Sequence, residues 1–133
     1  MQFSRSLRPA IACAVSVVAC LAYAATRNSL PDWLRGHAGG VPYVLFWILL
    51  WLTVIPRRTA IPWISVGCVL FTCWLEVFQL YQGPQWLIDF RRTTLGAAWL
   101  GAGFDPWDIP PYFLGGVLGW WIGTLVVPTT PEP

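Results

Sequence analysis

The stretch IPWISVGCVLFTCWLEVFQLY, residues 61–81, gives the clearest indication of the fold of this chain. It carries no charged side chain before Glu76, and a helix of roughly 20 residues is enough to cross about 30 Å of hydrocarbon. Backbone N–H and C=O groups in lipid must find their partners inside the segment, and the stretch shows no alternation of apolar and polar residues. It therefore predicts a membrane-spanning helix.

Three other apolar runs cover residues 9–25, 41–55 and 109–127, and clusters of charge, Pro and Gly separate them. The chain is 56% hydrophobic and only 11% charged, with a mean hydropathy of +0.59, which leaves too few charges to cover a soluble domain. The ten tryptophans fit aromatic belts at the membrane interfaces. We expect an all-α, polytopic membrane helical bundle with four transmembrane helices, forming one integral membrane domain over residues 1–133.

The first run has an alternative interpretation. Arg5 and Arg8 precede it and the triplet Ala-Tyr-Ala at 22–24 ends it, as in a cleavable signal peptide. We expect it to stay as an anchor, because more membrane-spanning sequence follows. With the N-terminus in the cytoplasm, each side carries four arginines, so the positive-inside count is a tie. We favour this orientation because the first helix usually dominates; the arginines are Arg5, Arg8, Arg57 and Arg58 inside, and Arg27, Arg35, Arg91 and Arg92 outside.

Residues 86–100 form an unusual segment between the third and fourth runs. The sequence Gln-Gly-Pro at 82–84 ends the third helix, since Gly and Pro do not continue it comfortably. The apolar pattern then resumes but is interrupted by Asp89, Arg91, Arg92 and Thr93. This segment is too short and too polar to span the bilayer, and it predicts a short interfacial or re-entrant helix.

Several classes of function are disfavoured. The net charge is +2, lysine is absent and no basic run is longer than a pair, so we expect no nucleic acid partner. All four cysteines (Cys13, Cys20, Cys68 and Cys73) lie in apolar runs without a His or carboxylate at ligand spacing, so we expect neither metal nor cofactor. We interpret them as small apolar residues at helix contacts, the alternative being a disulfide between helices.

Small residues recur at every fourth position of the last run, at Gly115, Gly119 and Gly123. Such a face lets two helix backbones approach closely. Two interpretations follow: an interface with a second copy or another membrane protein, and packing against another helix of the same chain.

Glu76 and Gln79 lie one turn apart near the end of the third helix and share a face. An acidic residue at the bilayer centre costs about 2.5–3.5 kcal/mol on insertion scales, so it needs a partner or a wet cavity. Glu76 could form an ion pair with Arg91 or Arg92, belong to a headgroup-binding or catalytic site, or reach interfacial water. Each interpretation is open at this point.

An enzymatic site would use the same residues. A guanidinium fork matches phosphate oxygens, so Arg91 and Arg92 would bind a phosphate and Glu76 would act as general base. His37 is the only histidine and has no serine beside it, and we interpret it as a solvated loop residue. Asp108 stands where the last helix starts, where a carboxylate complements the helix dipole. The candidate ligand-binding residues are thus Gln79, Asp89, Arg91, Arg92, Thr93 and Asp108.

The second half of the chain resembles a known bacterial family. Its motifs resemble those of the domain of unknown function 2809. They are EVFQLYQ at 76–82, WL at 86–87, RRTTLG at 91–96 and LGAGF at 100–104, followed by Asp108, Tyr112 and Gly115. The stretch also resembles a drifted VanZ-like pattern, with Glu76 and Gln79 followed by Asp89, Thr93 and Gly96, where Thr93 replaces an Asn. The resemblance implies a small inner-membrane protein with a polar site between the third helix and the following segment.

The first family has no established activity, and VanZ-like proteins are associated with resistance to lipoglycopeptide antibiotics. We therefore expect a multi-pass protein of the bacterial inner (plasma) membrane and cell envelope. Its expected role is that of a binding or scaffold protein with a polar site at the membrane interface, with membrane lipid or another membrane protein as partner. The alternative is an enzyme acting on a lipid-linked phosphate.

Overall fold

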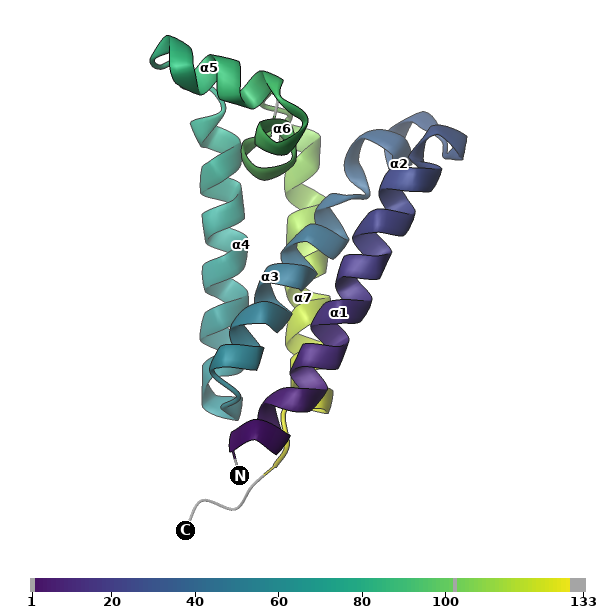
Figure 1. The fold of residues 1–133 in the computed structure, drawn as a ribbon, viewed down its shortest axis with the longest axis vertical. Helices are drawn as coiled ribbons and strands as arrows, with labels where there is room; N and C mark the ends of the chain where they lie inside the picture. Colours follow the sequence, from purple (N-terminus) through teal and green to yellow (C-terminus); the bar gives the residue numbers. More distant parts are fainter. Residues whose placement is uncertain (1, 102, 130–133) are drawn as a thin grey trace.

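The computed structural model describes residues 2–101 and 103–129, with side chains from residue 5 onward. The described residues form helices and connecting turns without a strand, which confirms the predicted all-α fold (Figure 1). Three short 3₁₀ turns, η1 (Arg27–Ser29), η2 (Arg58–Ala60) and η3 (Pro106–Asp108), join the α-helices. The α-helices are α1 (Gln2–Thr26), α2 (Asp32–His37), α3 (Gly40–Val54), α4 (Ile61–Phe78), α5 (Gln85–Arg92), α6 (Thr94–Leu100) and α7 (Ile109–Val126).

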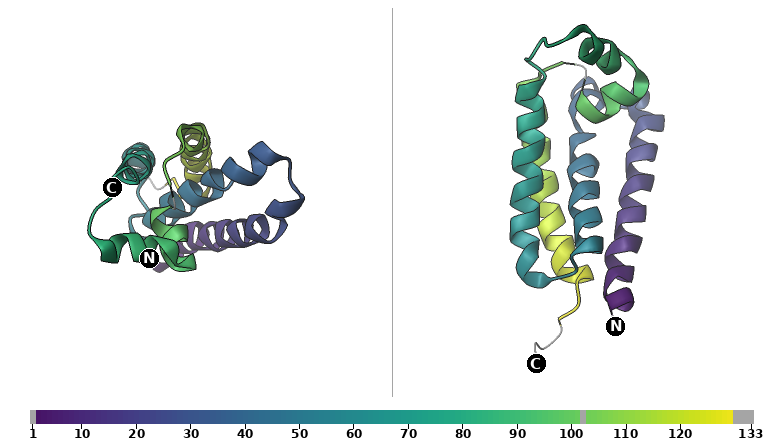
Figure 2. Two further views of the ribbon diagram at one scale, coloured as in Figure 1. Left: turned by 90° about the horizontal axis from the view of Figure 1, so that it is seen from above. Right: turned by 60° about the vertical axis from the view of Figure 1, so that its left-hand side comes forward.

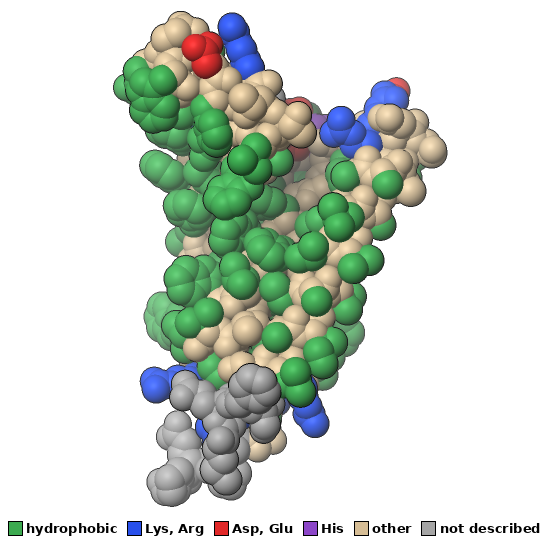
Figure 3. Space-filling model, in the orientation of Figure 1, with side chains coloured by type: hydrophobic (Ala, Val, Ile, Leu, Met, Phe, Trp, Pro, Cys, Tyr) green, Lys and Arg blue, Asp and Glu red, His purple; other side chains and the backbone are tan. Residues whose placement is uncertain are grey.

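Four stretches are long and apolar enough to cross a membrane, which confirms the predicted four spans. They cover Arg5–Ser29, Asp32–Val54, Arg58–Phe78 and Pro106–Val126. Basic side chains gather at the two ends of the molecule, and hydrophobic side chains cover the face between them (Figure 3). Val18, Leu70 and Leu125 are each more than half exposed on the long helices. This distribution suits a protein whose middle lies in lipid and whose ends meet water.

Helix α3 occupies the centre of the bundle and packs against α7 and α1, while α4 packs on α7 (Figure 2). Val44, Ile48 and Leu52 on α3 are completely buried. A Cβ atom added to Gly119 would lie 2.5 Å from Ile48 Cδ1, so this side of α7 has no room for a larger residue. The glycine face of α7 therefore packs within the same chain, which is the second of the two interpretations above.

Gly115 and Gly123 extend this close approach along α7. An added Cβ would lie 2.8 Å from the Val41 carbonyl oxygen at Gly115, and 2.9 Å from Leu52 Cδ1 at Gly123. Both glycines are buried. Dispersion contacts with the Val41 backbone and with the side chains of Ile48 and Leu52 replace contacts with lipid along this face.

Two arginines donate hydrogen bonds to the last backbone carbonyls of α4 and α7. Arg91 donates from Nη1 to the Tyr81 carbonyl at 2.8 Å and from Nη2 to the Phe78 carbonyl at 3.0 Å. Arg58 donates to the Val127 carbonyl at 3.2 Å and to the Thr124 carbonyl at 2.6 Å. The last carbonyl groups of a helix have no partner within it, and a guanidinium supplies several donors at once.

The segment between α4 and α7 lies across one end of the bundle as two short helices (Figures 1 and 2). Seen from above, α5 lies to one side of α4, and α6 folds back toward the ends of α1 and α3 (Figure 2). Thr93 separates the two and caps α6, its Oγ1 accepting a hydrogen bond from the Gly96 N–H at 3.0 Å. An added Cβ at Gly96 would collide with the Phe90 carbonyl, so the reversal needs glycine there. The predicted segment 86–100 is thus present, divided at a Thr-capped turn.

Candidate functional site

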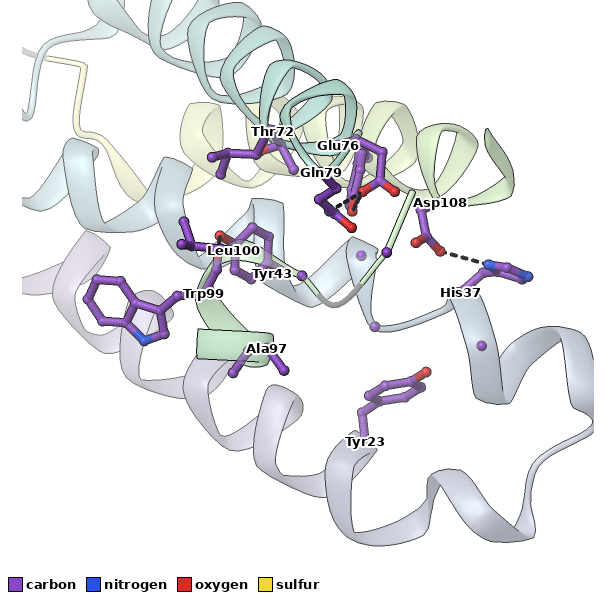
Figure 4. A pocket seen from close by; sticks show the side chains of 18 of the residues that line it. Tyr23, His37, Tyr43, Thr72, Glu76, Gln79, Ala97, Trp99, Leu100 and Asp108 are labelled. Atoms are coloured by element: carbon purple, nitrogen blue, oxygen red, sulfur yellow. Dashed lines mark hydrogen bonds and ion pairs between the residues drawn. The ribbon is translucent and has the colours of Figure 1, made fainter. Parts of the chain in front are cut away.

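A polar cleft of about 250 Å³ opens at the end of the bundle that carries α6. Residues from α1, α2, α3, α4, α6 and α7 line it, so the site exists only in the assembled fold (Figure 4). Its polar lining consists of Tyr23, Arg27, Arg35, His37, Tyr43, Thr72, Glu76, Gln79, Asp108 and Tyr112.

The carboxylate of Glu76 is 1% exposed and lies at the floor of the cleft. Its Oε2 accepts hydrogen bonds from Gln79 Nε2 at 3.1 Å and from the Tyr112 hydroxyl at 2.9 Å. Its Oε1 accepts one from the Asp105 backbone N–H at 2.9 Å. Three donors from α4, α7 and the loop before α7 thus offset the cost of burying this group.

These contacts answer the question of which partner Glu76 has. The ion pair with Arg91 or Arg92, one of the three sequence-based interpretations, is wrong: among the described residues neither arginine lies within ion-pair distance of Glu76. The buried position also contradicts the interpretation that it reaches interfacial water. The geometry leaves a carboxylate held by neutral donors at the floor of a cleft.

Gln79 continues the floor one turn further along α4. It is 8% exposed, and because Nε2 donates to Glu76, its Oε1 is left buried without a partner among the described residues. Gly101 closes over this amide with φ of 74°, a conformation that favours glycine, and an added Cβ would collide with Gln79. A buried carbonyl-type acceptor without a donor is costly.

His37 and Asp108 form a second polar pair in the cleft. His37 Nδ1 lies 2.7 Å from Asp108 Oδ1, and their side chains are 14% and 26% exposed (Figure 4). The interpretation of His37 as a solvated loop residue is therefore wrong, because it ends α2 and faces Asp108. Asp108 does stand at the start of α7, as predicted, but its carboxylate makes no capping bond and contacts His37 instead.

Two arginines that enter the sequence-based prediction only through the positive-inside count also line the cleft. Arg27 follows α1, and Arg35 lies on α2. Arg35 pairs with Asp32, whereas Arg27 has no carboxylate within ion-pair distance among the described residues. Tyr23 donates to the Arg35 carbonyl at 2.6 Å and so fixes α2 against α1. The signal that could have found both arginines is that the predicted topology places them at the same end as Glu76.

The remaining sequence candidates lie outside the cleft lining. Arg91 is 7% exposed and its guanidinium stacks on the Phe78 ring at 4.9 Å while capping α4. Arg92 and Asp89 are exposed and 4.0 Å apart, and Thr93 caps α6. The structure thus brings together Glu76, Gln79 and Asp108, and gives the other four candidates contacts within the α5–α6 segment and with the end of α4.

The carboxylates and His37 form no metal site in the described part of the chain. No group of three His, Cys, Asp or Glu side chains there lies close enough to hold an ion. The polar side chains that line the cleft can support hydrogen bonding, charge pairing and proton transfer.

The family model described as Protein of unknown function (DUF2809) matches residues 29–116. This range contains the whole polar lining of the cleft apart from Tyr23 and Arg27, which lie on α1 and η1. No curated protein and no solved structure matches the chain.

Proposed function

The chain belongs to the family of proteins of unknown function DUF2809, and we propose that it is a membrane protein that binds a polar headgroup in the cleft beside Glu76. The observation that carries this proposal is the unpaired Gln79 Oε1, buried and lining the cleft. A ligand with a hydroxyl or ammonium group would supply the missing donor, and pairing this acceptor would recover its desolvation cost.

The mouth of the cleft favours an anionic group on the same ligand. Arg27 lines it without a carboxylate partner among the described residues, and Arg35 lines it beside Asp32. A guanidinium binds phosphate oxygens through parallel N–H donors. A phosphate near Arg27 with a hydroxyl or ammonium near Gln79 would match both ends of the site.

We place the protein in the bacterial inner membrane as a protein of the cell envelope, with the N-terminus in the cytoplasm and the cleft at the outer face. The orientation is supported by the contacts of Arg91, which is buried and caps α4. A buried, structured arginine should count less in the positive-inside balance than Arg5, Arg8, Arg57 and Arg58 at the other end.

The test uses glycerophosphoglycerol, a soluble molecule with a phosphate and several hydroxyls, as the probe. We expect it to raise the unfolding temperature of the detergent-solubilised wild-type protein, because it binds only the folded state. Gln79→Leu should abolish this rise, and the matched control Gln82→Leu, at an exposed glutamine of the α4–α5 turn, should keep it. A wild-type protein that does not respond, or a Gln79→Leu protein that responds equally, would overturn the proposal.

A second candidate, an enzyme that hydrolyses a lipid-linked phosphate, is favoured by the His37–Asp108 pair. When Nδ1 carries the proton and donates it to Asp108, Nε2 is free to accept a proton from an attacking water. That water would form a bond to phosphorus as the bond to the leaving oxygen breaks, and the proton taken up by Nε2 would pass to the leaving oxygen. Arg27 and Arg35 would replace Arg91 and Arg92 as the phosphate ligands, because only the former pair lines the cleft. Phosphate release that is lost in His37→Gln, with probe binding retained, would support this role.

A further inference from the structure

We infer that the ligand of the cleft is a membrane phospholipid, and that a segment of one acyl chain lies in an apolar groove between α3 and α4. This inference rests on the proposed function and adds the class of ligand. The groove has a volume of about 480 Å³. Its walls include Trp47 and Trp51 from α3, and Gly67, Phe71 and Thr72 from α4.

The groove lies in the part of the bundle that lipid would surround. Trp51 and Phe71 are 48% and 57% exposed, and both belong to stretches that are apolar enough to span the membrane. α3 and α4 meet at the η2 turn and diverge toward the end that carries α6 (Figure 1). An added Cβ at Gly67 would meet no atom within 4 Å, so the α4 wall is open at this position.

Thr72 lines both the groove and the cleft, so the two cavities adjoin at this residue. Its hydroxyl donates to the Cys68 carbonyl at 2.7 Å and is thereby satisfied within the helix. Glu76 lies four residues beyond Thr72 and Gln79 lies seven beyond it, so the lining of α4 changes from apolar to polar over roughly 6–10 Å. A phospholipid changes from hydrocarbon to phosphate and headgroup in the same order.

The two cavities together therefore match an amphiphile better than a soluble metabolite. In the cleft, a hydroxyl or ammonium group of the headgroup would donate to Gln79 Oε1, and the phosphate of the lipid would bind Arg27. The chain would pass Thr72 and lie beside Gly67 and Phe71. A soluble ligand would account for the cleft but not for the apolar groove that shares Thr72 with it.

The decisive variant is Gly67→Phe, which fills the groove where an added Cβ meets no atom within 4 Å. Val66→Phe is the matched control, since the adjacent Val66 is 50% exposed and is not part of the groove lining. The probes are phosphatidylglycerol in detergent micelles and its soluble counterpart glycerophosphoglycerol. We expect Gly67→Phe to weaken binding of phosphatidylglycerol roughly tenfold or more and to leave binding of glycerophosphoglycerol unchanged. Val66→Phe should change neither.

Each outcome separates the two proposals. If Gly67→Phe binds phosphatidylglycerol as the wild type does, or if the wild type binds only the soluble probe, the lipid inference is overturned and the headgroup site stands. If the wild type binds neither probe, both proposals fail. Should Gly67→Phe not yield a monodisperse protein, wild-type protein with a phosphatidylglycerol that carries a photoreactive group at mid-chain provides the test. Labelling of the α3 peptide around Trp47 and Trp51 or of the α4 peptide around Gly67 and Phe71 supports the inference, and labelling confined to α1 or α7 overturns it.

Discussion

The hydroxyl of Tyr112 on α7 donates a 2.9 Å hydrogen bond to Oε2 of the buried Glu76 on α4. This contact joins two spanning helices at the floor of the cleft and helps to satisfy a charge that lipid alone would not tolerate. The same carboxylate holds Gln79 and the loop before α7, so the shape of the site and the stability of this end of the bundle depend on one group.

Tyr112→Phe should lower the stability of the protein, because a buried carboxylate loses one of its three donors. A hydrogen bond to a charged group contributes about 1.5–3 kcal/mol. We expect a lower unfolding temperature in detergent. Tyr81→Phe is the control, since Tyr81 is 56% exposed, and equal unfolding temperatures for the two variants would contradict the assigned role of Tyr112.

Gly119→Ala should destabilise the bundle, because the new methyl group would lie 2.5 Å from Ile48 Cδ1 in the core. Overpacking of this kind costs about 1–3 kcal/mol. Gly67→Ala provides the comparison, since an added Cβ meets no atom there and alanine favours the helix by up to about 1 kcal/mol. Unfolding in a mild detergent should place the two variants on opposite sides of the wild type, and a Gly119→Ala protein as stable as Gly67→Ala would refute the packing of α3 on α7.

Arg91→Met should lower stability without removing the ligand site. The variant leaves the Phe78 and Tyr81 carbonyls at the end of α4 without their donors, at a cost of about 1–3 kcal/mol. Arg92→Met, at an exposed position paired only with Asp89 at 4.0 Å, should change the unfolding temperature little. The affinity of folded Arg91→Met for glycerophosphoglycerol should equal that of the wild type, and a large loss would restore Arg91 as a phosphate ligand.

Unlike Arg91→Met, Arg27→Ala should lower the affinity for glycerophosphoglycerol more than it lowers the stability of the protein. Arg27 lines the cleft and its side chain has no carboxylate partner in the described part of the chain. Removal of one charge-assisted contact to a phosphate should weaken binding of glycerophosphoglycerol roughly tenfold. Arg57→Ala, at the opposite end of the bundle, is the control, and titration calorimetry of the two variants provides the comparison. Equal affinities would show that the anionic group binds elsewhere.

Much of the fold could be predicted from the sequence, because the requirement to satisfy backbone groups within lipid admits few arrangements. The four apolar runs became α1, α3, α4 and α7. Their predicted boundaries lie within a few residues of the observed ones, apart from the longer start of α1. The third helix ends at Phe78 instead of 81, since the chain turns there under Arg91. A cap supplied by a residue from a later segment leaves no local signal.

The candidate site could be predicted only where its residues share one helix face. Glu76 and Gln79 are one turn apart, so their pairing follows from helix geometry. The contact between His37 and Asp108 joins residues 71 positions apart, and it depends on how α2 folds over the end of α7. Closeness in sequence to Glu76 predicts Arg91 as a site residue, yet its guanidinium is directed to the backbone carbonyls of Phe78 and Tyr81 at the end of α4. Sequence periodicity identifies which residues share a helix face, but not which other segment of the chain packs against that face.

Native mass spectrometry of the protein extracted from bacterial membranes in a mild detergent is the sharpest test of lipid binding in the cleft. We expect a bound phospholipid on the wild-type protein and on Gln82→Leu. We expect loss of that lipid from Gln79→Leu, with the protein still folded, because the replaced amide carries the unpaired acceptor of the cleft. Equal retention of lipid by Gln79→Leu and the wild type, or a wild-type protein without bound lipid, would contradict a lipid site at Gln79.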